Sequence, residues 1–273
     1  MKRAIGFNLG QRGDIIMNTV VARSFKQRNP DYHLTLGVGP QFADMEPFFE
    51  AHPDIDDFHV YASYNGWPNQ TDREYLMGAG YDVVFNGMPQ HTHPEWWKYY
   101  HQAQETCWMH GQPIPSDNLQ CRLTKWFPTD ECRDWIAFAP FAGWYNQNND
   151  KKLSYSRAQE IADLIITRGY KVLQIGGPGE PKLQRSTFFE GTYFESIRAV
   201  LGCSLFVHTD TGAGWAISGY GFPQLGLYSN AYYTKEFVKN IQPVTKAGVF
   251  LDAVNVYFIH LDMIAQVMKD MGV

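Results

Sequence analysis

Short apolar runs alternate with segments of helical periodicity along most of this chain. Residues 4–9 form an apolar run that ends in Gly10, and residues 14–27 then carry apolar or small side chains at a helical spacing. Further apolar runs, each closed by a short turn, predict strands. We expect strands at residues 4–9, 33–38, 58–61, 81–85, 135–139, 171–175, 205–207 and 223–228. Strands that alternate with helices across short turns predict a parallel sheet with helices on both faces.

The predicted helices follow the same alternation, and the helix before Arg168 has a candidate capping box in Ser156 and Gln159. The stretch 88–131 differs, since it is rich in His, Trp, Tyr, Gln and Pro and ends in a linker-like segment. It separates two α/β units, so we expect two lobes with a ligand cleft between them. The expected boundaries are residues 1–130, residues 131–255 and a C-terminal helix at 256–273.

Composition narrows the class of protein. The 273 residues are 44% hydrophobic and 19% charged, as in a globular protein, and the net charge is −5. This acidic balance argues against broad binding to nucleic acid or to anionic membranes. The four cysteines lack CxxC or zinc-finger spacing, which favours reduced thiols. No run approaches the ~20 apolar residues of a membrane-spanning helix, so we expect a soluble, cytoplasmic protein without a transmembrane segment.

The segment 204–221 carries the clearest chemical signal. Its apolar run breaks into Asp210, Thr211, Gly212 and Gly214, and a helix of small residues follows. Free N–H groups and the positive end of a helix dipole favour an anion there, and glycine lets a phosphate approach closely. An ordinary helix N-cap is the alternative, because Asp and Thr are favoured at that position in any case.

Other strand ends carry candidate ligand groups. Gly13 and Asp14 follow the first strand, where the carboxylate is either a helix-dipole partner or a general base. Gly177 and Glu180 lie in a turn whose glutamate either accepts hydrogen bonds from ribose hydroxyls or is solvated. Two lysines, Lys151 and Lys152, precede a predicted helix. A positive charge is unfavourable at the start of a helix, so these lysines either contact a phosphate or are solvated at the surface.

Together these motifs resemble the heptosyltransferases of lipopolysaccharide synthesis, in glycosyltransferase family 9. The similarity covers GDIIMNTVVARSFKQRNPDYHLTLGVGP, NDKKLSYSRAQEIADLIITRGYKVLQIGGPGEP and LGCSLFVHTDTGAGWAISGYGFPQLGLYS, in the family's order. It departs at Leu153-Ser154, where the family usually has Trp-Pro, and at 213–216. The resemblance implies a GT-B type α/β fold with two Rossmann-like lobes that face a central cleft.

The resemblance also implies roles for these residues. Asp14 matches the catalytic base, and the C-terminal lobe would bind a nucleotide diphosphate sugar, with no metal and no further cofactor. Lys151, or Lys152 if the register slips, matches the lysine that contacts the donor phosphate. Glu180 matches the acidic residue near the ribose. The match to the diphosphate-binding helix start comprises Asp210, Thr211 and Gly212.

His91 and His93 stand in an aromatic segment of the first lobe. Two histidines without a nearby third ligand make a poor zinc motif. They either position a hydroxyl of the acceptor, next to Gly13, or belong to a helix whose aromatic rings pack into the lobe.

The leading hypothesis is transfer of a sugar to a hydroxyl acceptor, such as a lipopolysaccharide core glycan. Three alternatives remain open from the sequence. In the first alternative, the acceptor is a modified nucleobase in DNA, because aromatic rings stack on bases, although the negative net charge disfavours binding to nucleic acid. In the second alternative, the chain is a nucleotide-sugar epimerase of the related two-lobed type. In the third, it binds a nucleotide or a sugar without turnover.

Overall fold

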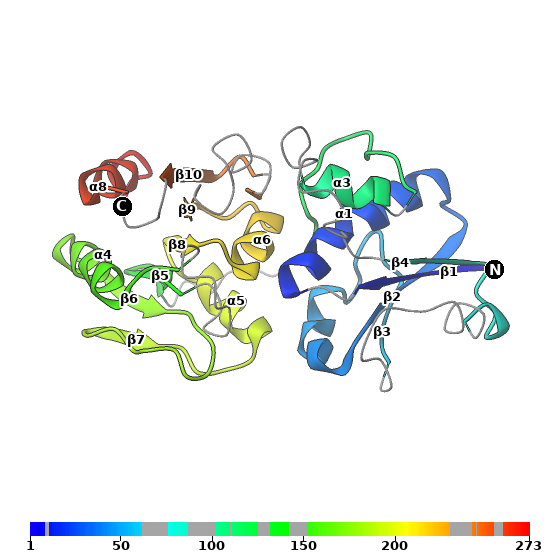
Figure 1. Ribbon diagram of the computed structural model, residues 1–273, viewed down its shortest axis with the longest axis horizontal. Helices are drawn as coiled ribbons and strands as arrows, with labels where there is room; N and C mark the ends of the chain where they lie inside the picture. Colours follow the sequence, from blue (N-terminus) through cyan, green and yellow to red (C-terminus); the bar gives the residue numbers. More distant parts are fainter. Residues whose placement is uncertain are drawn as a thin grey trace. The chain divides into compact units, whose positions relative to one another are not determined.

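The computed structural model divides the chain into two compact units, Met1–Lys125 and Trp126–Val273 (Figure 1). It describes residues 1–8, 11–61, 76–86, 102–109, 111–124, 132–141, 152–229, 242–243, 245–253 and 259–273. The lobe boundary expected near residue 130 falls outside this described part.

The first unit is built on a parallel sheet of four strands in the order β3-β2-β1-β4. Its strands are β1 (Lys2–Asn8), β2 (Tyr32–Val38), β3 (Asp57–Val60) and β4 (Val83–Asn86). Ala4 of β1 lies opposite Leu34 on one side and Val83 on the other. A strand with neighbours on both sides and helices on its faces is buried, which explains the continuous apolar run at the start of the chain.

The helices described in this unit include α1 (Arg12–Arg28), the 3₁₀ helix η1 (Pro40–Phe48) and α3 (Gln102–Met109). The helix α1 is buried without interruption over residues 15–25. It contacts both β1 and β2 on the sheet and α3. Its buried residues include the polar Asn18, Thr19, Arg23 and Ser24, so the amphipathic pattern of this helix in the sequence is weak. The prediction at 14–27 located it, whereas α3 was not predicted.

The second unit has a six-stranded parallel sheet in the order β10-β9-β8-β5-β6-β7. The strands are β5 (Trp135–Ala139), β6 (Lys171–Gln174), β7 (Ser186–Phe188), β8 (Leu205–Thr209), β9 (Gln224–Ser229) and β10 (Gly248–Ala253). The predicted α/β fold with two parallel sheets is thus confirmed. The edge strands β7 and β10 were missed, since each consists of half-buried and exposed residues and lacks a fully buried apolar run.

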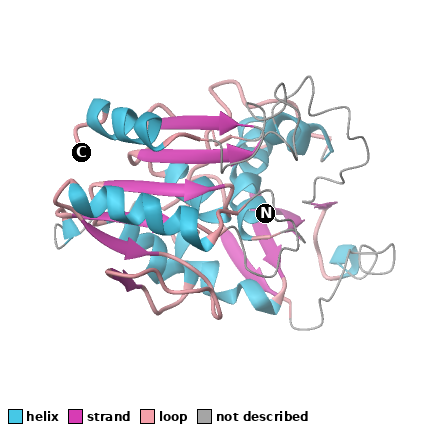
Figure 2. Ribbon diagram, turned by 60° about the vertical axis from the view of Figure 1, so that its left-hand side comes forward, coloured by secondary structure: helices cyan, strands magenta, loops and turns pink. Residues whose placement is uncertain are grey.

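Helices cover both faces of the second sheet (Figures 1 and 2). On one face, α4 (Tyr155–Thr167) and α8 (Leu261–Asp270) share a core with side chains such as Phe138 and Val207. On the other face lie α5 (Tyr193–Leu201) and α6 (Gly212–Gly219), which contact each other. The alternation of strand side chains therefore sends Phe206 and His208 toward α6.

One local prediction in this unit is wrong. The helix α4 begins at Tyr155, and its N-cap is Ser154, whose hydroxyl accepts a hydrogen bond from Arg157 N at 3.2 Å. The predicted capping box at Ser156 therefore lies two residues too late. Both serines have a suitable side chain, and the extended backbone at Ser154 (ψ 159°) decides which of them caps the helix.

Candidate active site

The strand order of the second unit defines where a ligand would bind. The chain proceeds outward from β5 through β6 and β7 on one side, and from β8 through β9 and β10 on the other. The loops after β5 and β8 therefore leave the sheet in opposite directions. In open parallel sheets the crevice at such a switch point, outside the carboxyl ends of the strands, is the ordinary place for a ligand.

The candidate donor-site residues of the second unit follow three neighbouring strands. Lys152 is held at the end of β5, because the next residue, Leu153, donates from its N–H to the carbonyl of Pro140 at 3.1 Å. The Gly177–Glu180 turn follows β6, and Asp210 follows β8. The fold thus brings to one edge the residues Lys152, Gly177, Glu180, Asp210, Thr211, Gly212 and Gly214. Lys151 lies outside the described residues.

Thr211 is the N-cap of α6. Its Oγ1 accepts a hydrogen bond from Gly214 N at 3.3 Å, and its backbone is extended. The first N–H groups of an α-helix lack partners within the helix and point along its axis. The N-cap expected as the plain alternative is therefore present, and it leaves the geometry that an anion requires in place.

Glu180 is folded back over its own turn. Its N–H donates to the carbonyl of Gly177 at 3.2 Å, and Gly179 adopts a φ of +83°. A Cβ on Gly176 would overlap Glu180 Oε2, so the carboxylate packs directly against the backbone of this turn. The side chain is only 8% exposed, which makes the solvated-glutamate alternative wrong. Its carboxylate is fixed at the carboxyl edge of the sheet.

His208 is a residue of this region that the sequence analysis missed. It lies in β8 two positions before Asp210 and is fully buried. Burial lowers the pKa of its imidazole, so the ring is neutral near pH 7. The available signal was a histidine inside an otherwise apolar strand that runs directly into the Asp-Thr-Gly turn.

In the first unit, Gly13 and Asp14 lie in the first turn of α1, after the central strand β1. The strand order places this turn at the switch point between β1 and β4. Asp14 Oδ2 accepts a hydrogen bond from Gln11 N at 2.7 Å. The cation of the same turn, Arg12, forms a 3.0 Å ion pair with Asp44 of η1. Asp14 is therefore oriented by its own helix start.

Within the described ranges, no group of three or more His, Cys, Asp or Glu side chains could hold a metal ion. His91 and His93 fall outside those ranges. Among the helices that the structure describes, none is both long and apolar enough to cross a membrane.

Comparison with protein-family models finds no match, and neither does comparison with curated proteins. Solved structures do match. Heptosyltransferase WaaC of E. coli, solved with ADP, superimposes with a TM-score of 0.70 over 98% of this chain and 99% of its own, at 13% identity. The chain has the fold of the family 9 glycosyltransferases. The glycosyl transferase family 9 protein from Veillonella parvula gives a TM-score of 0.66 over 98% of this chain and 91% of its own, at 16% identity.

A third match with this family 9 fold is TibC of enterotoxigenic E. coli, described as an iron-containing dodecameric glycosyltransferase. It gives a TM-score of 0.67 at 15% identity, and the alignment covers 99% of this chain and 76% of TibC. The predicted GT-B type architecture is thus confirmed at the level of the fold.

Proposed function

We propose that this protein is a glycosyltransferase that moves a sugar from a nucleotide diphosphate sugar to an acceptor hydroxyl. One observation carries the proposal. The switch point of the second sheet gathers a capped helix start, a lysine and a buried glutamate at one edge. The same fold in WaaC was solved with ADP.

The donor would be bound by the second unit, within the predicted lobe 131–255. Backbone N–H groups at the start of α6 would hold the diphosphate, and Lys151 or Lys152 would add a positive charge. The Glu180 carboxylate would accept hydrogen bonds from the ribose hydroxyls, which a fixed and nearly buried acceptor does well.

The transfer step would use Asp14 as the general base. The acceptor hydroxyl would give its proton to the Asp14 carboxylate while its oxygen bonds to the anomeric carbon. The bond from that carbon to the phosphate oxygen would break, and the diphosphate would leave with the electron pair. The helix start and the lysine would stabilise this charge without a metal or further cofactor.

The acceptor would contact the first unit, the predicted lobe 1–130. Gly13, His91 and His93 are our candidates for that contact. We propose a glycan such as a lipopolysaccharide core as the acceptor class. Cytoplasmic location stays a prediction.

The first test measures binding by thermal shift. The melting temperature with ADP, UDP, GDP or dTDP is compared with the melting temperature in the presence of the corresponding nucleoside. A ligand that binds only the folded state raises the melting temperature by mass action. We expect one diphosphate to stabilise the protein more than its nucleoside does. The matching sugar nucleotide is then incubated with core glycan or with DNA that carries a modified base, and the released diphosphate is measured.

Release of the diphosphate together with glycosylated glycan supports the proposal. Transfer to DNA would overturn the acceptor class. Interconversion of the donor without release would identify an epimerase, and binding without any turnover a non-catalytic protein.

The role of Asp14 is tested with Asp14→Asn. The amide oxygen can still accept from Gln11 N, so the helix start is preserved. We expect kcat to fall by about 10²- to 10⁴-fold, the usual contribution of a general base, while the Kd for the diphosphate stays constant. The matched control is Asp262→Asn, an acidic residue in the first turn of α8. Full activity of Asp14→Asn would exclude the role.

A further inference from the structure

The imidazole of His208 lies between the second sheet and α6, and both ring nitrogens contact polar atoms. Nδ1 is 2.6 Å from the carbonyl oxygen of Thr209, and Nε2 is 3.0 Å from Oε1 of Gln224. A carbonyl oxygen only accepts hydrogen bonds, so Nδ1 carries the proton. The Gln224 amide can donate to a neutral Nε2 after a half-turn about its last bond.

Aromatic neighbours fix the plane of the ring. Phe206 stacks on it with centroids 4.8 Å apart and an interplanar angle of 18°. Tyr228 of β9 meets it edge-on at 6.3 Å. Two polar contacts and two aromatic neighbours hold the ring in this orientation.

The backbone of α6 lies directly against this ring. A Cβ on Gly214 would be 2.5 Å from Cε1 of His208 and 2.9 Å from Nδ1, distances that real Cβ atoms do not reach. The helix thus comes as close to the sheet as a glycine allows. The N–H of Gly214 is also the group that the Thr211 side chain caps.

These contacts bracket the candidate phosphate-binding turn. The Thr209 carbonyl belongs to the peptide that leads into Asp210, and Gly214 lies in the first turn of α6. We propose that His208 is a positioning residue of the donor site, because its imidazole braces this turn at both ends and so sets where the first N–H groups of α6 point. This inference rests on the proposed function, in which those N–H groups hold the diphosphate.

The test compares the affinity for a nucleoside diphosphate with that for its nucleoside, by calorimetry with ADP and adenosine and with the UDP, GDP and dTDP pairs. His208→Phe keeps an aromatic ring in the space but removes both polar contacts. His208→Asn places an amide N–H near the position of Nδ1 and keeps the contact to Thr209. Val207→Ala, on the opposite face of β8 and away from the His208 ring, is the control for altered packing.

We expect His208→Phe to weaken the diphosphate about tenfold, the worth of one hydrogen bond, and to leave the nucleoside within twofold. His208→Asn should recover part of the loss, and Val207→Ala should affect both ligands equally. An equal loss of both ligands in His208→Phe, or no loss, would overturn the positioning role.

A second pair of variants covers the case in which His208→Phe fails to fold. Gly214→Ala should weaken the diphosphate because the new methyl group meets the ring. The double variant Gly214→Ala/His208→Ala should bind it more tightly than Gly214→Ala, since the ring is gone. No recovery in the double variant contradicts the bracing contact. If wild-type protein binds no diphosphate better than its nucleoside, the proposed function itself fails, which is a separate result.

Discussion

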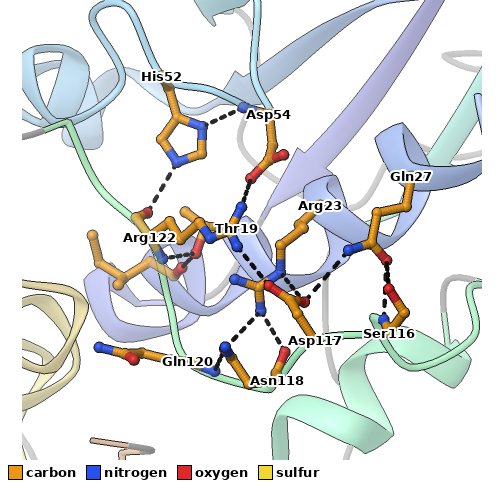
Figure 3. Close-up of polar contacts among 11 residues, drawn as sticks. Thr19, Arg23, Gln27, His52, Asp54, Ser116, Asp117, Asn118, Gln120 and Arg122 are labelled. Atoms are coloured by element: carbon orange, nitrogen blue, oxygen red, sulfur yellow. Dashed lines mark hydrogen bonds and ion pairs between the residues drawn. The ribbon is translucent and has the colours of Figure 1, made fainter. Parts of the chain in front are cut away.

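Arg23 Nε lies 3.2 Å from Oδ1 of Asp117, an ion pair between the middle of α1 and a distant segment of the chain. Arg23 is only 1% exposed, and its Nη2 donates to the carbonyl of Asn118 at 2.5 Å. Arg122 reaches the other oxygen of Asp117 at 2.5 Å (Figure 3). One buried guanidinium thus holds the segment that follows α3 against the helix that carries Asp14.

Replacing the carboxylate partner should destabilise the first unit. Asp117→Ala leaves the buried Arg23 guanidinium without its nearest carboxylate. The expected cost is about 2 kcal/mol of unfolding free energy, less than for a pair buried on both sides, because the Asp117 side chain is 32% exposed. Urea denaturation measures this loss. The control is Asp31→Ala, which removes an exposed ion pair with Lys2 and should leave the unfolding midpoint unchanged. Equal midpoints for the two variants would show that the buried pair contributes nothing.

Stability should fall as the pH falls below about 6.5, the ordinary histidine pKa. Burial lowers the pKa of His52, and its Nδ1 accepts a hydrogen bond from Asp54 N, which requires the neutral ring. The unfolded chain then binds a proton that the folded chain does not. Stability is therefore full above pH 6.5 and is lost as the pH falls toward the folded pKa, by about 1.4 kcal/mol per pH unit for such a histidine.

Urea titrations at pH 8, 6.5 and 5 measure this slope. His52→Gln should make it shallower, because the variant lacks the ring at position 52 and only the contribution of buried His208 remains among the two described histidines with a lowered pKa. The control variant is His33→Gln, which removes a histidine that is half-buried, whereas His52 is buried. An unchanged slope in His52→Gln would contradict the assignment.

Two threonine N-caps of the second unit separate stability from binding. Thr211 caps α6 and Thr192 caps α5, each by accepting an N–H hydrogen bond. Either change to alanine should cost about 1 kcal/mol of unfolding free energy. Only Thr211→Ala should also weaken the nucleoside diphosphate, because α5 does not begin at the switch point. Calorimetry that finds equal affinities in both variants would argue against the α6 site.

Glu180→Gln tests the ribose contact. The amide matches the carboxylate in size, but its NH₂ group cannot accept hydrogen bonds from ribose hydroxyls. We expect the preference for ADP over 2′,3′-dideoxy-ADP to shrink by about fivefold, roughly one hydrogen bond. Glu190→Gln is the matched control, since Glu190 forms an exposed ion pair with Lys182. A preference that stays at the wild-type value would place the ribose elsewhere.

Local patterns were sufficient for most of the fold. The strand predicted at 135–139 matches β5, and the glycine turns after β6 and β8 follow their strands as expected. Alternating strands and helices already imply parallel sheets, because a short connection leaves few other topologies. Elements at the edges, such as β10, lack the buried apolar run on which that prediction depends.

The sequence by itself determined the α/β fold and the candidate turns, because backbone preferences and hydrophobic periodicity act between near neighbours. Only the tertiary structure decided which polar residues are buried and what they contact. The partners of Arg23 and His208, at Asn118 and Gly214, come from other elements, so local sequence patterns do not reveal these contacts. Burial is a property of segments brought together by folding, so the support beneath the Asp210–Thr211 turn became visible only in three dimensions.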